Sequence, residues 1–444
     1  MYLRKLHIRN LRLIRDLRLS FEQAPGTPRM WTVLIGRNGT GKTSILQAIA
    51  LASAGYLRAN QLAGPLSVSM PDRRHADEKM EIDASFCFGS LGDGQHRRRQ
   101  YPEWGSRTRP VVQSSLSITP GSVDLVGRSR YTQMDFLNDV DPLQQARSEE
   151  LSHWFVAGYG VSRHLAVGDH EREVGKPSHD RLVPLFRPTP LIGLGFADLF
   201  TPENARRFSR ILRRVLTTTA DLVPDIRDVE LGGRGGIQRA ADLYDRDRFE
   251  QTLPSGSIKL PATWLSHGYQ ASLAWLADLV GQILLDFGGD DIPEVEPEHM
   301  EGLVLIDELD LYLHPTWQAG LVRALKDTFP RLQFVASTHS PILLNALRPE
   351  EVVSLYLDDE GNVRARHGVD DPRLATGTEL YSKFFGIDRL YPSDLGDQLD
   401  RYGHLAVDPF RSDAEDDEMR RLGEQLRTEG IEMTLEPVER ERVG

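Results

Sequence analysis

Eight consecutive residues near the start of the chain carry its clearest chemical signal. They run from Gly36 to Thr43 and fit the spacing G-x-x-x-x-G-K-[ST] in full. In this pattern the glycines let main-chain N–H groups wrap a phosphate chain, the lysine reaches the outer phosphates, and the threonine hydroxyl binds Mg²⁺. These residues and the serine after them are the predicted nucleotide-binding loop: Gly36, Arg37, Asn38, Gly39, Thr40, Gly41, Lys42, Thr43 and Ser44.

The segments around this loop are those that a phosphate site requires. Residues 30–35 form an apolar run, which predicts a buried strand that ends at the loop. Residues 44–52 predict a helix that begins directly after the loop and directs its partial positive charge at the phosphates. An ordinary glycine turn before a helix is the alternative, and the strand–loop–helix order argues against it.

A second apolar run ends in two acidic residues. Residues 303–306 predict a buried strand, and Asp307 and Glu308 follow it directly. In open α/β sheets, ligands bind at the carboxyl ends of the strands. We therefore expect Asp307 to hold the same Mg²⁺ as Thr43, and Glu308 to orient or deprotonate the water that attacks ATP.

A polar hexapeptide, residues 265–270, precedes an apolar stretch at residues 271–280 that predicts a helix. Ser266 and Gly268 would lie at the N-terminus of that helix, a place that favours anions. A serine–glycine turn that only caps a core helix is the alternative, and for the hexapeptide alone it is the better interpretation. The position of the hexapeptide, after the phosphate loop and before the acidic strand, favours a role at the nucleotide.

Taken together, these segments resemble ABC-type ATPases of the SMC, RecF and OLD kind. The hexapeptide is similar to the L-S-G-G-Q signature of that class, in which Ser266, Gly268 and Gln270 match while His267 and Tyr269 depart. The resemblance implies an α/β fold, the head of an ABC ATPase or P-loop NTPase. Such a head would have a β-rich nucleotide lobe and a helical lobe, here followed by a short charged C-terminal tail.

The resemblance also implies roles for three single residues. His339, at the end of an apolar run, lies where this class places a histidine that touches the γ-phosphate. Asp310 corresponds to the D-loop residue that crosses to the partner subunit, and Arg12 matches a position that contacts nucleotide in some relatives. The segment 157–163 is similar to an A-Y-G-x-x-R element of these ATPases.

In heads of this class, the signature of one subunit completes the site of another. The resemblance therefore implies a head-to-tail homodimer, or a higher oligomer, with two ATP molecules between the heads. The signature residues and Asp310 would act in trans, whereas Lys42, Glu308 and His339 would be catalytic within their own chain. ATP binding would close the dimer and hydrolysis would open it, so that the nucleotide state can gate a partner.

More narrowly, the chain resembles the soluble bacterial AAA-family ATPases of anti-phage defence, similar to the ATPase subunits of Septu and PARIS, whose nuclease is a separate protein. The segment after His339 contains no D-x-D pair, which the Toprim nuclease domain of the OLD nucleases carries. We expect an ATP hydrolase that senses phage or foreign DNA and gates a nuclease or other effector encoded nearby. A RecF-like repair ATPase that clamps DNA is the alternative, and an orphan transport subunit is disfavoured.

Composition favours a cytoplasmic protein with no membrane partner. A hydrophobic fraction of 40% is enough for a sizeable core. The single cysteine, Cys87, allows no internal disulfide and favours a reducing compartment. No apolar run approaches the length that a transmembrane helix needs, and no signal peptide precedes the first strand.

Charge leaves the question of DNA binding open. The net charge of −12 argues against general affinity for nucleic acid. Arginines nevertheless cluster at residues 97–99 and, with helical spacing, at residues 206–214. Solvated faces, contacts with DNA, or a docking face for an acidic partner would each explain these clusters.

The chain is expected to fall into four parts. They are an N-terminal ATPase lobe with an insertion (1–165), a helical or insertion region (166–255), a C-terminal ATPase lobe (256–370) and a tail (371–444). Residues 286–301 are expected to form an exposed acidic loop, and residues 413–417 a solvated acidic run before a charged helix. The Q-loop glutamine is left open among five candidates: Gln100, Gln113, Gln133, Gln144 and Gln145.

Overall fold

The described part of the chain forms two compact units in this computed structural model, Met1–Leu374 and Ala375–Gly444. No described helix is both long enough and apolar enough to cross a membrane. The residues that the structure describes are 1–88, 111–132, 141–148, 154–163, 178–192, 196, 200–217, 226–230, 248–261, 264, 267–287, 296–368, 370–387, 393–431 and 437–438.

A six-stranded sheet forms the centre of the first unit, in the order β16-β15-β5-β14-β13-β9. Five of its strands are parallel, and only β16 runs antiparallel to its neighbour. Parallel strands end at the same edge of a sheet, so the residues that follow β5, β13 and β14 come together there. The strands are β5 (Trp31–Gly36), β9 (Val156–Tyr159), β13 (Gly302–Ile306), β14 (Leu332–Ser337), β15 (Val352–Leu357) and β16 (Val363–His367).

A second, five-stranded sheet is antiparallel, in the order β2-β1-β6-β7-β8. Along its strands, apolar residues that face the core alternate with polar residues, the pattern of a sheet with one solvated face. In β1, for example, Leu6 and Ile8 are buried, whereas Lys5 and Arg9 are exposed. The strands are β1 (Tyr2–Leu11), β2 (Ile14–Ser20), β6 (Met80–Cys87), β7 (Val111–Ile118) and β8 (Val126–Tyr131).

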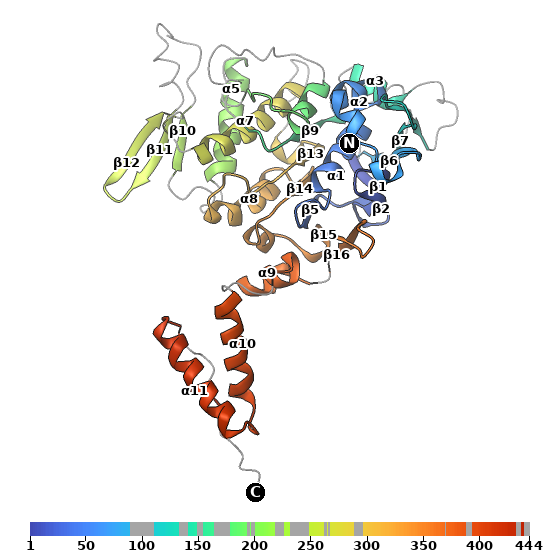
Figure 1. Cartoon of the computed structure of the whole chain (residues 1–444). Coiled ribbons are helices and arrows are strands. Elements are labelled where there is room, and N and C mark those ends of the chain that lie inside the picture. The colour runs from blue at the N-terminus through green and yellow to red at the C-terminus, as the bar shows by residue number, and fades with distance from the viewer. Residues whose placement is uncertain are drawn as a thin grey trace. The chain divides into compact units, whose positions relative to one another are not determined.

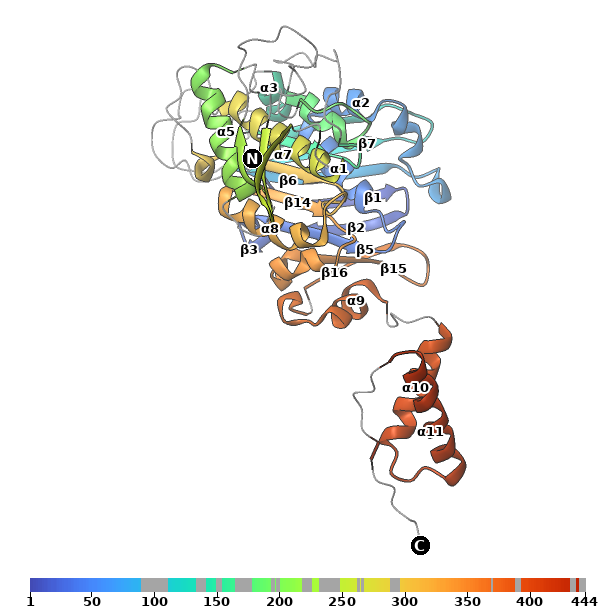
Figure 2. The same cartoon turned by 90° about the vertical axis from the view of Figure 1, so that its left-hand side faces the viewer.

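The helix α1 (Lys42–Ala54) contacts strands of both sheets, as Figures 1 and 2 also show. Every residue of α1 except Thr43 is buried. Its sequence is apolar on all sides, which suits a helix enclosed by the core. Because α1 begins at the phosphate loop, this core fixes the position of the loop.

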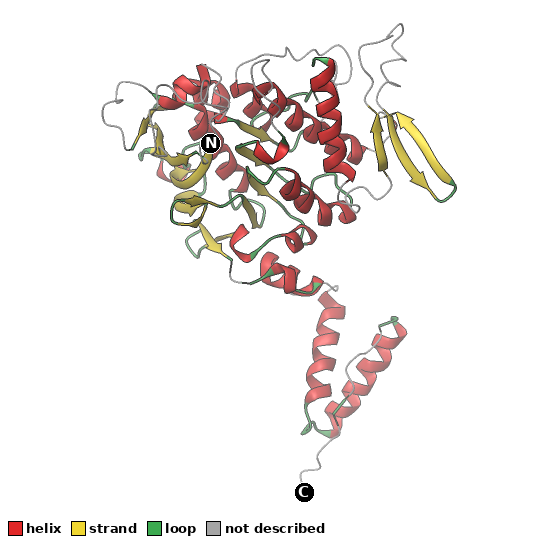
Figure 3. Cartoon of the chain, turned by 180° about the vertical axis from the view of Figure 1, so that it is seen from behind, coloured by secondary structure: helices red, strands yellow, loops and turns green. Residues whose placement is uncertain are grey.

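Three further helices pack together in the first unit, because α5 contacts both α7 and α8. They are α5 (Pro202–Thr217), α7 (His267–Phe287) and α8 (Pro315–Thr328). A three-stranded antiparallel sheet lies beside α5, as seen from behind in Figure 3. Its strands are β10 (Ile226–Glu230), β11 (Arg248–Leu253) and β12 (Gly256–Pro261).

Shorter elements complete the first unit. The strands β3 (Glu22–Ala24) and β4 (Thr27–Pro28) pair with each other, and the helices α2 (Tyr56–Ala63) and α3 (Pro142–Ser148) contact α1. The 3₁₀ helices are η1 (Gly64–Ser69), η2 (Arg73–His75), η5 (Ser178–Leu185), η8 (Pro297–His299), η9 (Ile342–Ala346), η10 (Pro349–Glu351) and η11 (Pro372–Leu374).

The second unit is helical, with α9 (Gly377–Phe385), α10 (Ser393–Val407) and α11 (Asp413–Thr428). A small core joins α10 to α11 through Tyr402, Leu405, Ala406, Met419 and Leu426. Capping boxes begin two of the helices, formed by Thr376 with Glu379 and by Ser412 with Glu415.

The α/β class is confirmed, but two local expectations are wrong. The two ends of the segment 286–301 are not an exposed loop, because the Asp286 side chain is only 3% exposed and pairs with Arg181, and Glu301 is buried. Residues 288–295 lie outside the described residues. The acidic run 413–417 does not precede a charged helix; it forms the first turns of α11. Carboxylates in this position stabilise the helix through their interaction with its dipole. Its member Asp416 is buried against Arg411, so the run is not wholly solvated.

Candidate nucleotide site

The phosphate loop lies between β5 and α1, and its glycines have conformations that other residues disfavour. Gly39 and Gly41 both have φ near +84°, in the left-handed region. Gly36 has φ +147°, and a Cβ atom there would lie 2.4 Å from the Leu355 carbonyl oxygen. The loop therefore passes so close to β15 that only glycine fits at its first position.

The amine of Lys42 folds back across the loop. Its Nζ donates to the carbonyl oxygens of Gly36 at 2.7 Å and Arg37 at 3.2 Å. Burial lowers the pKa of this amine, and the charges of Asp307, Glu308 and Asp310 partly oppose that effect. A buried cation that is held by carbonyl dipoles can exchange them for phosphate oxygens, which bear full charge.

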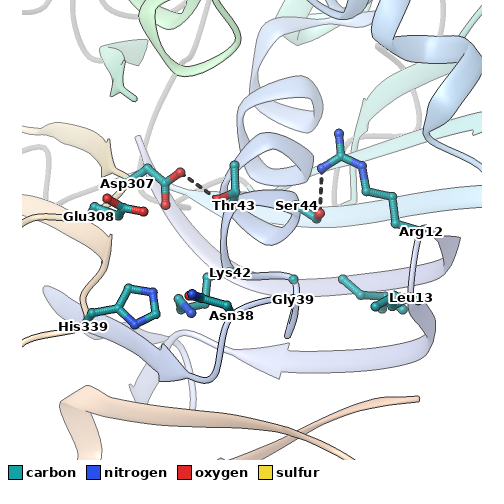
Figure 4. Close-up of a pocket in the computed structure, with 12 residues that line it drawn as sticks. Arg12, Leu13, Asn38, Gly39, Lys42, Thr43, Ser44, Asp307, Glu308 and His339 are labelled. Carbon is teal, nitrogen blue, oxygen red and sulfur yellow. Dashed lines mark hydrogen bonds between the residues drawn. The ribbon is translucent and has the colours of Figure 1, made fainter. Parts of the chain in front are cut away.

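Two hydroxyl groups hold the carboxylate of Asp307. Thr43 Oγ1 donates to Oδ2 at 2.7 Å, and Ser337 Oγ donates to Oδ1 at 2.6 Å. The Glu308 main-chain N–H in turn donates to Ser337 Oγ at 2.8 Å. The ends of β13 and β14 and the start of α1 thus meet at one carboxylate. Figure 4 shows the bond from Thr43.

The Thr43–Asp307 pair fits a magnesium ion. Two oxygen ligands at neighbouring octahedral positions, each about 2.1 Å from Mg²⁺, lie about 3.0 Å apart. The observed separation of 2.7 Å is close to this value. Within the described ranges, no group of three or more His, Cys, Asp or Glu residues could hold a metal alone. The site therefore suits a metal whose remaining ligands come from phosphate and water.

Glu308 has an unusual main-chain conformation for a residue with a side chain. Its φ is +48°, a left-handed value that costs roughly 1–2 kcal/mol in a non-glycine residue. Strain of this kind persists only where neighbouring contacts impose it. The half-buried Glu308 side chain lines the same cavity as Lys42 and Thr43, within reach of a phosphate chain.

Asp310 and His339 are 29 positions apart in the sequence but are in contact in the folded chain. Asp310 Oδ1 accepts hydrogen bonds from Thr338 Oγ1 at 2.6 Å and from the His339 main-chain N–H at 3.1 Å. His339 is exposed and lines the cavity on the same side of the loop as the acidic pair (Figure 4). Asp310 therefore fixes the turn that presents His339, and its predicted role in trans stays a prediction.

Arg12 lies on the other side of the phosphate loop, near Leu13 (Figure 4). Its guanidinium donates to Ser44 Oγ at 2.8 Å, and its own φ is +52°. Partial burial lowers the pKa of Arg12 from its ordinary value. The cavity between these two sides has a volume of about 340 Å³ and is lined by Arg12, Leu13, Ile14, Asn38, Gly39, Gly41, Lys42, Thr43, Ser44, Asp307, Glu308 and His339.

The two signature residues that the structure describes do not line this cavity. Gly268 and Gln270 lie in the first turn of α7 and are absent from the cavity wall, and Ser266 lies outside the described residues. Among the Q-loop candidates, Gln113 lies in β7 and the neighbouring Gln144 and Gln145 lie in α3, away from the cavity wall. The other two, Gln100 and Gln133, lie outside the described residues.

Arg163 is a residue of this site that motif reasoning did not assign. It is only 2% exposed, and its guanidinium donates to the carbonyl oxygens of both Asp307 and Glu308. Burial lowers its pKa to about 10, so it remains charged at neutral pH. The only signal in the sequence was its place at the end of the segment 157–163.

Two family models match the chain. Residues 118–345 match the family described as "AAA domain, putative AbiEii toxin, Type IV TA system", and residues 1–90 match "AAA ATPase domain". The first match covers more than half of the chain. Together the two matches include the phosphate loop, both acidic residues and His339.

Curated relatives include a Septu protein and a probable ATPase of a retron. "Septu protein PtuA" of Bacillus mycoides is 24% identical over 429 residues, which cover 96% of this chain and 50% of the relative. "Retron Ec83 probable ATPase" of Escherichia coli is 29% identical over 171 residues, which cover 38% of this chain and 29% of the relative. The chain thus spans about half the length of PtuA and less than a third of the length of the retron ATPase. The predicted similarity to Septu ATPases is confirmed.

Among solved structures, the chain is similar to the SMC head in "Crystal structure of the SmcHead bound to the C-winged helix domain of ScpA". The TM-score is 0.48 and the sequence identity is 16%. The match covers 82% of this chain and 97% of that chain.

Proposed function

The chain belongs to the AAA-domain family whose model matches residues 118–345, and from this premise we propose that it hydrolyses ATP at the cavity where β5, β13 and β14 end. The observation that carries the proposal is the convergence at Asp307. A hydroxyl from the phosphate loop and a hydroxyl from β14 bind one carboxylate, at an oxygen spacing that suits magnesium. The family match supports a nucleoside triphosphate as the ligand.

Different residues of the chain have different roles in hydrolysis. Lys42 turns from its loop carbonyls to the β- and γ-phosphates and stabilises the charge that develops there. Thr43 and Asp307 would hold Mg²⁺, which would supply positive charge against the phosphates. Glu308 orients the attacking water or accepts its proton, and His339 lies where it can contact the γ-phosphate.

The functional unit is proposed to be a head-to-tail dimer. The cavity wall contains residues of the phosphate loop, Asp307, Glu308 and His339, but neither of the signature residues that the structure describes, Gly268 and Gln270. A second copy would supply Ser266, Gly268 and Gln270 across the γ-phosphate. Hydrolysis would then depend on dimerisation, and the nucleotide would act as a reversible link between two heads.

The similarity to PtuA and to a retron ATPase supports a role in anti-phage defence. In this role the ATP-bound dimer would restrain or license a separate effector protein, and a nuclease encoded nearby is the proposed effector. The chain matches only half of PtuA, so this role is proposed for the ATPase portion that the two proteins share.

Two measurements test these proposals in turn. Purified protein should hydrolyse ATP with Mg²⁺, and Lys42→Ala should lose nucleotide binding; equal turnover by Lys42→Ala would refute the assignment of the phosphate loop. The protein should then co-purify with a nuclease expressed from a neighbouring gene. A bare dimer that retains DNA instead would contradict the effector proposal and favour a RecF-like clamp.

A further inference from the structure

Arg163 is not among the residues that line the cavity; it contacts the main chain of Asp307 and Glu308. One of its nitrogen atoms donates to the carbonyl oxygens of Asp307 and Glu308, the latter at 2.9 Å, and its Nε donates to the carbonyl oxygen of Gly160 at 2.9 Å. Each of these bonds goes to the main chain. The guanidinium therefore acts on the path of the backbone after β13 and touches neither acidic side chain through them.

This arrangement explains the left-handed conformation of Glu308. The strand β13 is paired with β9 up to Ile306 and Tyr159, and the Asp307 N–H donates to the Tyr159 carbonyl oxygen at 2.8 Å. Beyond that point two successive carbonyls must face the same guanidinium, which demands a sharp turn of the chain. The φ of +48° at Glu308 supplies the turn, and it directs the side chain to the cavity.

The opposite side of Arg163 faces α7. Its guanidinium carbon lies 5.9 Å from the centre of the Trp275 ring, a cation–π distance. Nearby, Tyr159 Oη donates to Asp278 Oδ2 at 3.1 Å, and the rings of Tyr159 and Trp275 are 5.9 Å apart. Trp275 and Asp278 are buried residues of α7, the helix whose first turn carries the predicted signature residues.

We propose that Arg163 is a positioning residue for ATP hydrolysis, which holds the main chain of Asp307 and Glu308 so that the Glu308 carboxylate stays directed at the attacking water. Through Trp275 it also fixes the acidic pair relative to α7. The inference rests on the proposed function, because it needs Glu308 to act on water. In this role Arg163 does not contact the nucleotide; it acts through its hydrogen bonds to main-chain carbonyl groups.

A purely structural role for Arg163 makes a different prediction. A buried cation that only satisfies carbonyl groups would, on removal, lower stability and reduce all activities in proportion to the unfolded fraction. A positioning residue would instead lower kcat and leave ATP affinity nearly unchanged, because a displacement of about 1 Å at a reacting group costs on the order of a hundredfold in rate. The split between kcat and ATP affinity therefore distinguishes the two roles.

The test uses Arg163→Lys and Arg163→Gln in the full chain. Each keeps an N–H donor but lacks the rigid fork by which Arg163 bonds the Gly160 carbonyl oxygen through one nitrogen and those of Asp307 and Glu308 through another. We expect kcat to fall by about 30- to 100-fold while the Kd for ATP changes by less than about threefold. Arg147→Lys is the matched control, since buried Arg147 donates to the carbonyl oxygens of Ser53 and Trp154, away from the acidic pair. It should lose stability but keep kcat.

A double-substitution cycle with Glu308→Gln identifies the residue through which Arg163 acts. If Arg163 acts through Glu308, Arg163→Lys should slow the residual hydrolysis of the Glu308→Gln protein by less than about twofold. Fully additive losses, or a wild-type kcat in either folded Arg163 variant, would overturn the inference. If Arg163→Lys does not fold, Arg163→Gln decides the result, because it removes the buried charge.

The same experiment separates this inference from the proposed function. Wild-type turnover by Glu308→Gln alone would refute the catalytic role of Glu308, and the inference would fall with it. A slow Glu308→Gln protein together with fully active Arg163 variants would refute only the positioning role.

Discussion

Thr43 and Asp307 are 264 positions apart in the chain, yet the threonine hydroxyl donates to the aspartate carboxylate at 2.7 Å. One residue lies in the first turn of the helix after the phosphate loop, and the other follows the strand β13. Their contact depends on the parallel order of β5, β14 and β13 and on the burial of α1 between the sheets. The fold thus brings the two oxygen atoms to a spacing that would suit one metal ion.

The magnesium requirement should depend on the Thr43 hydroxyl. Thr43→Ala removes one of the two protein oxygens, so we expect the Mg²⁺ concentration for half-maximal turnover to rise by at least about tenfold. Thr43→Ser is the matched control, since it keeps the hydroxyl and should stay within about twofold of wild type. A titration of ATP turnover with Mg²⁺ measures both. Equal magnesium curves for the alanine and serine proteins would exclude Thr43 as a ligand.

Glu308→Gln should separate binding from hydrolysis. The amide keeps the size of the side chain but cannot accept a proton, so kcat should fall by about 10²- to 10⁴-fold. The Kd for ATP should change little, because the phosphate loop is intact. Single-turnover kinetics and equilibrium binding of labelled ATP measure these two effects. A protein that loses both turnover and binding would place Glu308 in the ATP-binding set instead.

Two loop glycines should differ in their cost of substitution. At Gly36 an alanine Cβ would lie 2.4 Å from the Leu355 carbonyl oxygen, so Gly36→Ala should destabilise the fold by about 3 kcal/mol or more. At Gly39 nothing lies within 4 Å of such a Cβ, and Gly39→Ala should cost only about 1–2 kcal/mol, for its left-handed conformation. Urea denaturation of both variants gives the comparison. Similar losses for the two would contradict the close approach of the loop to β15.

A shared site predicts complementation between two inactive proteins. Lys42→Ala should disable the phosphate loop, and Ser266→Arg should disable the signature. In a mixed dimer, one site combines both defects and the other has none, so an equimolar mixture should recover up to about a quarter of wild-type turnover. Continued inactivity of a mixture that demonstrably forms mixed dimers would argue for a site built within one chain.

The sequence predicted the parts of the site that depend on residue type and order. Strand, glycine loop and helix are local, and β5 and α1 lie within a few residues of their predicted bounds. Asp307 and Glu308, which follow an apolar run, were equally easy to recognise, because their expected roles depend on their own side chains. Parallel strand order then brings these segments together without further information.

Other features depend on contacts that cannot be predicted from the type of a residue. The bonds of Arg163 go to carbonyl groups, which every residue possesses, so only the folded chain shows which ones it meets. Likewise Asp286 was expected in an exposed loop because it is acidic, but Arg181, 105 positions away, pairs with it. Pairing across such a separation is a property of packing, not of local sequence.

The central claim is that ATP joins two copies of this chain through the site at Asp307 and Glu308. The most direct test is the solution mass of the Glu308→Gln protein with Mg²⁺, with and without ATP, together with the amount of nucleotide bound. The account predicts a monomer without ATP and a dimer that retains two ATP molecules with it. A monomer that holds unhydrolysed ATP would contradict the composite site.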